Sequence, residues 1–160
     1  MTLLKPVKKK SNKRGWSLLD TSFINTLKFE EIFSTNDFAK FGDSVVNFIY
    51  NASIFEAKSR LQGVKVWDSC LAEACKKSPL RSYIGSRKNK GELGDAVEAF
   101  IGYVYLAHKF SINQMIDILT QYLKYRSNQD EKNEQELCSA AFIHLVNHLC
   151  DKLGIVDKIL

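Results

Sequence analysis

Long hydrophobic runs are missing from this sequence, and so are most of the residues that interrupt helices. Only two prolines and eight glycines occur in 160 residues, so little in the chain breaks a long helix. No run of about 18 apolar residues is present, which argues against a membrane-spanning helix and against a membrane partner. The N-terminus is basic but lacks the apolar core of a secretory signal, so we expect a cytoplasmic protein.

Cysteine is too sparse for a secreted domain held together by disulfides. Such a domain usually carries more cysteines at closer spacing. The chain has four: Cys70, Cys75, Cys138 and Cys150. All four fall within expected helices, and we expect them to be reduced thiols.

Acidic residues are absent from positions 1–14, which hold six Lys or Arg, whereas the formal net charge of the whole chain is +5. This basic arm either contacts a polyanion or is a solvated tail, and its composition allows both. Charge is also uneven in the rest of the chain, with nine basic and three acidic residues between Glu56 and Lys90. A local basic surface is typical of a protein that binds nucleic acid.

The alternating pattern of β-strands is also absent, and apolar residues recur with helical spacing almost throughout. We therefore expect an all-α helical bundle, with residues 15–160 forming one domain. The expected helices cover 20–33, 38–61, 66–77, 91–108, 112–125 and 136–153, with a polar linker over 126–135. The helix over 91–108 is apolar nearly all round, which predicts that it is buried on most sides.

Two tetrapeptides echo each other, Gly-Asp-Ser-Val at 42–45 and Gly-Asp-Ala-Val at 94–97. Glycine inside a helix costs about 1 kcal/mol relative to alanine, so each glycine needs a structural reason. A missing side chain lets two helices approach closely. We therefore expect Asp43 to face Asp95 across a helix contact, together with Glu98, which lies one turn after Asp95.

Carboxylates gathered in a partly buried site repel one another unless a cation neutralises them. Mg²⁺, or Mn²⁺ in its place, suits oxygen ligands and is the usual cofactor for cutting phosphodiesters, because it activates water and stabilises the leaving oxygen. Asp43, Asp95 and Glu98 are therefore the candidate metal-binding and catalytic residues, with Asn47 and Glu92 as accessories. The residues by themselves leave an alternative open, in which these are ordinary exposed or salt-bridged helix acids.

The segment Phe-Gly-Asp-Ser-Val at 41–45 resembles the signature helix of the ribonuclease III family, and residues 94–106 resemble its second signature. The resemblance covers roughly residues 33–125. It implies the all-helical ribonuclease III domain, which pairs into a homodimer and holds double-stranded RNA in a valley. It also implies a metal site in each subunit, at Asp43, Asp95 and Glu98, that cuts one strand during RNA processing.

The chain departs from the family pattern at Asn36 and Ala39, where glutamates are usual. The minimal Mini-III branch, which the chain also resembles, tends to have a small residue at the position of Ala39. Too few residues follow Tyr125 in this sequence for a separate double-stranded-RNA-binding domain, so we expect the helical domain itself to bind RNA. The candidate contacts are basic: Lys58, Arg60, Arg81, Arg87, Lys88 and Lys90.

Two functions follow. The retained acids favour a Mg²⁺-dependent endoribonuclease that cuts double-stranded or structured RNA as a homodimer. The residues at 36 and 39 favour the alternative, a catalytically inactive ribonuclease III fold that binds RNA as a scaffold in a ribonucleoprotein.

Overall fold

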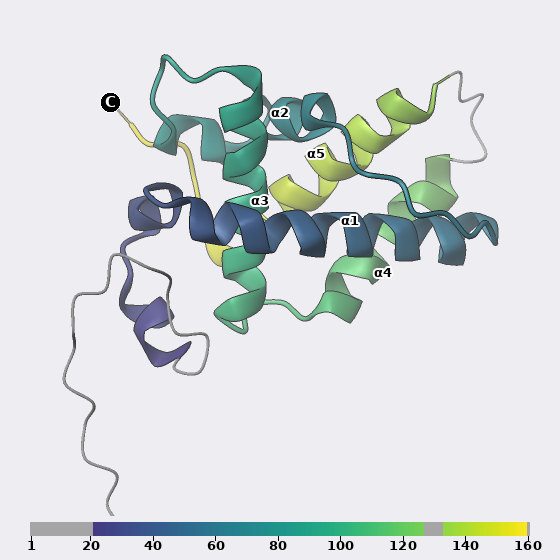
Figure 1. Ribbon diagram of the computed structural model, residues 1–160, viewed down its shortest axis with the longest axis horizontal. Coiled ribbons are helices and arrows are strands. Elements are labelled where there is room, and N and C mark those ends of the chain that lie inside the picture. Colours follow the sequence, from purple (N-terminus) through teal and green to yellow (C-terminus); the bar gives the residue numbers. More distant parts are fainter. Residues whose placement is uncertain (1–20, 127–132, 160) are drawn as a thin grey trace, which may run out of the picture.

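The computed structural model describes residues 21–126 and 133–159, and over these ranges the chain is built of helices without strands (Figure 1). The all-α prediction is confirmed. The elements in order are η1 (Thr21–Thr26), η2 (Phe29–Phe33), α1 (Asn36–Lys58), α2 (Asp68–Lys76), η3 (Pro79–Tyr83), α3 (Lys90–Leu106), α4 (Ile112–Arg126) and α5 (Glu134–Leu153). Within the same ranges, no helix is both long and apolar enough to cross a membrane.

Helix α3 forms the buried centre of the fold and crosses α1 steeply (Figure 1). Its Val97, Phe100, Ile101 and Val104 are fully buried and belong to one hydrophobic core with residues of α1, α2, α4 and α5. The predicted burial of this helix is thus confirmed inside a single chain. The apolar surface of α3 is therefore no reason by itself to expect a dimer.

The single helix expected over 20–33 is wrong in the part that the structure describes, which begins at residue 21. Two 3-10 helices, η1 and η2, stand in its place and are separated by an extended backbone at Lys28. The Lys28 N–H donates to the Glu31 carboxylate at 2.7 Å, which starts a new turn. Ile32 is fully buried, and Phe29 packs edge-on against Phe100 of α3. These packing contacts outweigh the helical spacing of so short a segment.

Helix α1 ends earlier than residue 61. Ser59 adopts a left-handed conformation (φ 52°), and its N–H donates to Phe55 O at 2.8 Å. Residues 59–67 then return along α1 (Figure 1). Asn51 holds this segment through both backbone groups of Val64, donating to its carbonyl at 2.8 Å and accepting from its N–H at 3.1 Å. Gly63 lies within this return.

The remaining helices lie within three residues of their predicted ends. Ser111 caps α4, because its Oγ accepts the Gln114 N–H at 3.1 Å. Helix α5 begins at Glu134 instead of 136, since the side chain of Asn133 accepts the Gln135 N–H and caps the earlier start. The basic arm over 1–14 and linker residues 127–132 lie outside the described residues. All four cysteines are buried and free.

Candidate active site

Gly42 brings the backbones of α1 and α3 into direct contact. A Cβ atom at this position would lie 1.8 Å from the carbonyl oxygen of Glu98, so no other residue fits without moving a helix. Gly102 completes the crossing, because a Cβ there would lie 2.9 Å from Phe38 O. Gly94 has a different role from the one its echo of Gly42 suggests. It faces α2, with its nearest contact at an ordinary 3.4 Å from Asp68 O.

The α1–α3 crossing places the three candidate acids in one cleft of about 310 Å³. Asp43 follows Gly42 on α1, whereas Asp95 and Glu98 stand one turn apart on α3. Helices α1, α3 and the start of α2 thus contribute its walls. The cleft is lined by Asn36, Ala39, Lys40, Asp43, Lys65, Asp68, Asp95 and Glu98.

Glu98 is the most perturbed acid of the cleft. Glu98 is 8% exposed. The pKa of its carboxyl is raised to about 8, first by burial and then by the charges of Asp43 and Asp95 and a hydrogen bond with Asp43. At the rim, the pKa of Asp95 is raised as well, first by burial and then by the charge of Asp68. A bound cation would relieve all of these costs.

Asn47 orients Asp43 rather than offering a free oxygen to a metal. Its Nδ2 donates to the Asp43 carboxylate at 2.9 Å and to the Asp43 carbonyl at 2.7 Å. Its Oδ1 accepts the N–H of Val66 at 2.7 Å. The same amide therefore fixes the Asp43 side chain and holds the returning segment against α1.

Three residues that line the cleft are not among those predicted from the sequence: Lys40, Lys65 and Asp68. Lys40 lies three residues before Asp43 on the same helix, so its helical spacing was an available signal. Lys65 and Asp68 arrive through the returning segment, and no periodicity points to them. The Lys65 charge opposes the upward pKa shifts of Asp95 and Glu98, so it acts directly on the acids.

The donor chemistry of the cleft fits Mg²⁺. Its acidic residues supply oxygen ligands, and the buried Glu98 carboxyl has another acid as its hydrogen-bond partner. Within residues 21–126 and 133–159, no three His, Cys, Asp or Glu side chains converge on a single ion position. To hold one ion together, the carboxylates of the cleft would have to rotate toward it.

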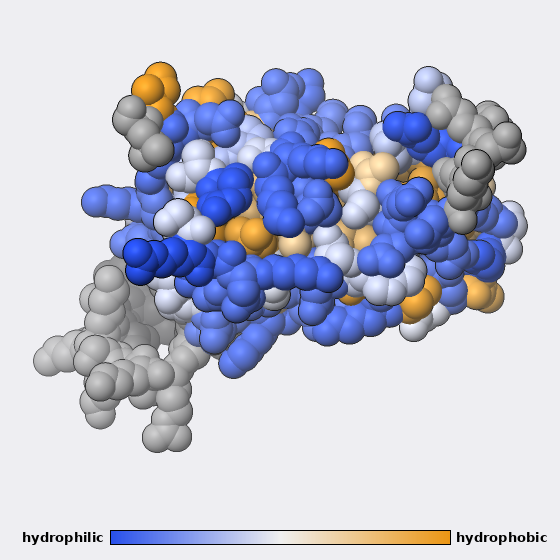
Figure 2. Space-filling model, turned by 90° about the horizontal axis from the view of Figure 1, so that it is seen from above, coloured by the Kyte–Doolittle hydropathy of each residue, from blue (hydrophilic) through white to orange (hydrophobic). Residues whose placement is uncertain are grey.

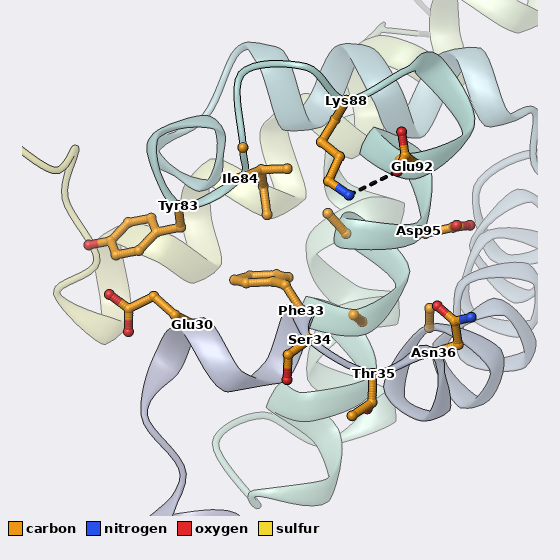
Figure 3. A pocket seen from close by; sticks show the side chains of 14 residues that line it. Glu30, Phe33, Ser34, Thr35, Asn36, Tyr83, Ile84, Lys88, Glu92 and Asp95 are labelled. Carbon is orange, nitrogen blue, oxygen red and sulfur yellow. Dashed lines mark hydrogen bonds and ion pairs between the residues drawn. The ribbon is translucent and has the colours of Figure 1, made fainter.

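Glu92 caps the start of α3 and does not line the cleft of acids. It closes a capping box at the start of α3, in which its carboxylate accepts the Asn89 N–H at 2.9 Å and its own N–H donates to Asn89 Oδ1 at 3.0 Å. Lys88 pairs with Glu92 at 2.8 Å and, with this bond, lowers the pKa of the Glu92 carboxyl. Figure 3 shows this pair beside Asp95 in a neighbouring pocket of about 290 Å³. Glu92 therefore shapes the edge of the site and lies outside the cleft of acids.

Two of the six predicted basic contacts lie far along α1 or beyond it. Lys58 is fifteen residues after Asp43, which at about 1.5 Å per residue separates the two backbones by roughly 22 Å. Arg60 follows the end of α1 and pairs with Glu134 at 2.7 Å. The structure thus places this pair away from the acids.

The other four basic residues lie between η3 and the first turn of α3. Arg81 folds back onto its own loop and donates to the Ile84 carbonyl at 2.8 Å. Lys88 is paired with Glu92, as described above. The last two are exposed: Arg87 and Lys90.

The profile described as Ribonuclease III matches residues 36–155, from the first residue of α1 to just beyond α5. No curated protein sequence matches the chain. The matched region holds all five α-helices of the described structure and the whole cleft of acids. Because the match spans most of the sequence, the chain belongs to the ribonuclease III family.

Proposed function

We propose that this protein is an RNA-processing endonuclease that cuts double-stranded RNA with Mg²⁺ bound in the α1–α3 cleft. The observation that carries the proposal is the burial of Glu98 beside Asp43 and Asp95, in a family whose domain acts on RNA. Buried like charges are costly, and a divalent cation offsets that cost. A purely structural role for the three acids leaves this cost unexplained.

The bound ion would supply Lewis acidity and an activated water for phosphodiester hydrolysis. The chain contributes the geometry. Asp43, Asp95 and Glu98 would hold the ion, while Asn47 keeps the Asp43 carboxylate turned toward the cleft. The raised pKa keeps the Glu98 carboxyl largely protonated at neutral pH without a metal, so binding of a cation there would release this proton.

Lys40 and Lys65 flank the acids and are the best-placed phosphate contacts of the cleft. Duplex RNA is recognised mainly through its phosphates and 2′-hydroxyls, which suits lysines beside the site of cutting. Arg87 and Lys90 extend the basic character to the loop before α3. The face of the molecule seen in Figure 2 is mostly hydrophilic, with separated hydrophobic patches.

We also propose that the protein acts as a homodimer formed along α1. Phe41, Phe48 and Phe55 follow one another at intervals of seven residues, which places them on one side of the helix. Phe48 is 59% exposed and Phe55 is 48% exposed, while Phe41 stacks on Tyr105 of α3 with ring centroids 6.0 Å apart. An exposed aromatic row of this kind is typical of a protein interface. Phe48→Glu is expected to convert a dimer into a monomer in light scattering.

Cleavage of an end-labelled RNA duplex tests the main proposal. The wild type is compared with Asp43→Asn and Glu98→Gln, which remove charge at nearly constant shape. Each variant is expected to cut roughly 100-fold more slowly or worse, since even outer partners of a metal ligand contribute 10–100-fold. Asp37→Asn is the matched control, because Asp37 lies in the first turn of α1 without lining the cleft.

The outcomes separate the two candidate functions. Cutting by the wild type and by Asp37→Asn, with loss in the two cleft variants, supports the nuclease. If the wild type binds the duplex but leaves it intact with either Mg²⁺ or Mn²⁺, the enzyme proposal fails. The RNA-binding scaffold then becomes the leading account.

A further inference from the structure

Asp68 enters the cleft from a third helix. It is the first residue of α2, and it reaches the cleft because residues 59–67 return along α1. Helix α2 sits against α3 at Gly94, where a Cβ would lie 3.4 Å from the carbonyl oxygen of Asp68. The backbone of Asp68 thus packs beside the residue that precedes Asp95. Its position is set by helix packing and by the Asn47–Val66 hydrogen bond two residues earlier.

Asp68 lines the same cleft as the three candidate metal ligands Asp43, Asp95 and Glu98. The four carboxylates come from three helices, α1, α2 and α3, which meet at this cleft.

Ala39 lines the same cleft without any donor atom. The wall that α1 forms at this point is therefore apolar, whereas the wall formed by α2 carries a carboxylate. Among the described residues that line the cleft, Asp68 of α2 is the one acid besides Asp43, Asp95 and Glu98.

We propose that Asp68 is a fourth acidic residue of the metal centre and binds the cation from the α2 side, directly or through a metal-bound water. The inference rests on the proposed function, since it concerns the same cation. It also assigns a function to the returning segment, residues 59–67. By holding residues 64 and 66 on α1, Asn51 and Asn47 deliver both Asp68 and Lys65 to the cleft.

A purely structural role for Asp68 makes a different prediction. An acid in the first turn stabilises a helix through the backbone N–H groups and the helix dipole. Removing that acid would lower the stability of the metal-free protein and leave cation affinity unchanged. As a metal-site residue, Asp68 instead contributes to cation affinity, so its loss weakens cation binding whatever its effect on the stability of the metal-free protein.

Binding of Mn²⁺ alone, measured from the free-ion signal in electron paramagnetic resonance, tests the proposal without a cleavage assay. We expect Asp68→Asn to weaken Mn²⁺ binding by roughly 10-fold or more. Asp37→Asn is the matched control, a first-turn acid of α1 that does not line the cleft, and is expected to bind as the wild type does. Asp43→Asn reports on the metal centre itself.

Each possible result either supports or overturns the role of Asp68 in cation binding. Wild-type affinity in Asp68→Asn, with weakened binding in Asp43→Asn, overturns the role of Asp68 and leaves the proposed function standing. Equal weakening in Asp68→Asn and Asp37→Asn also overturns it, because a general charge effect then accounts for the loss. Absence of Mn²⁺ binding by the wild type defeats both proposals. If Asp68→Asn does not fold, Asp68→Ser, which keeps a small polar side chain at the first residue of α2, takes its place.

Discussion

Replacing Gly42 with alanine is the most demanding test of the fold around the site. The new Cβ would lie 1.8 Å from Glu98 O and 2.4 Å from Glu98 C, both atoms of the α3 backbone. Ordinary contact begins near 3.4 Å, so the two helices must separate by roughly 1.5 Å at their crossing. Overpacking of a core costs typically about 1–3 kcal/mol, and a clash between two backbones belongs at the upper end or beyond.

Alanine also contributes a favourable term, since it is better than glycine inside a helix by about 1 kcal/mol. The net expectation for Gly42→Ala is a loss of about 2 kcal/mol or more in the free energy of unfolding. That is a large part of the roughly 5–15 kcal/mol that stabilises a typical domain. The variant should also bind Mn²⁺ poorly, because Asp43 and Glu98 move apart with their helices.

Gly94→Ala is the matched control, from the second of the two echoing segments. Its Cβ would meet Asp68 O at 3.4 Å and Leu71 Cβ at 3.7 Å, which are ordinary van der Waals distances. We expect this variant to be neutral or stabilised by up to about 1 kcal/mol. Urea denaturation followed by circular dichroism measures both variants. A Gly42→Ala midpoint at or above that of the wild type would refute the close helix crossing.

Three further predictions concern the cleft. In EDTA, the free energy of unfolding should fall as pH rises from about 4.5 to about 8, because over this range the folded chain keeps the Glu98 proton that the unfolded chain has lost. Urea titrations at several pH values should show that Glu98→Gln removes most of this slope; an unchanged slope would contradict the buried carboxyl. Asn47→Ala leaves the Val66 N–H without its acceptor, and urea denaturation should show a loss of about 1–3 kcal/mol. Lys65→Met should weaken duplex RNA binding and reduce its salt dependence by about one ion, whereas Lys58→Met, at the far end of α1, should change it less.

The two Gly-Asp segments show which features of the site a local sequence pattern can predict. This pattern correctly brought Asp43, Asp95 and Glu98 together, because helical spacing and the cost of a buried glycine can both be read along the chain. It assigned the wrong partner to one glycine, since Gly94 contacts α2 and the α1–α3 crossing uses Gly102. Which helix a small residue faces depends on packing, and packing is not local.

The basic contacts show the same limit. The excess of positive charge between residues 56 and 90 predicted a surface that binds a polyanion. The charge of a segment does not show where each of its side chains lies in the fold. The fold uses Arg60 for an ion pair with Glu134 and Arg81 to hold its own loop. The lysines beside the acids are Lys40 and Lys65.

The sequence by itself determined that this protein is helical, that α3 is buried and that three acids meet where two helices touch. These properties follow from apolar periodicity and from residues that are unfavourable unless the packing requires them, such as a glycine within a helix or a buried acid. Only the tertiary structure decided that residues 59–67 turn back along α1 and carry Lys65 and Asp68 into the cleft. That return depends on two asparagine side chains bonding to backbone groups 13 and 19 residues away, and such bonds leave no periodic trace in the sequence.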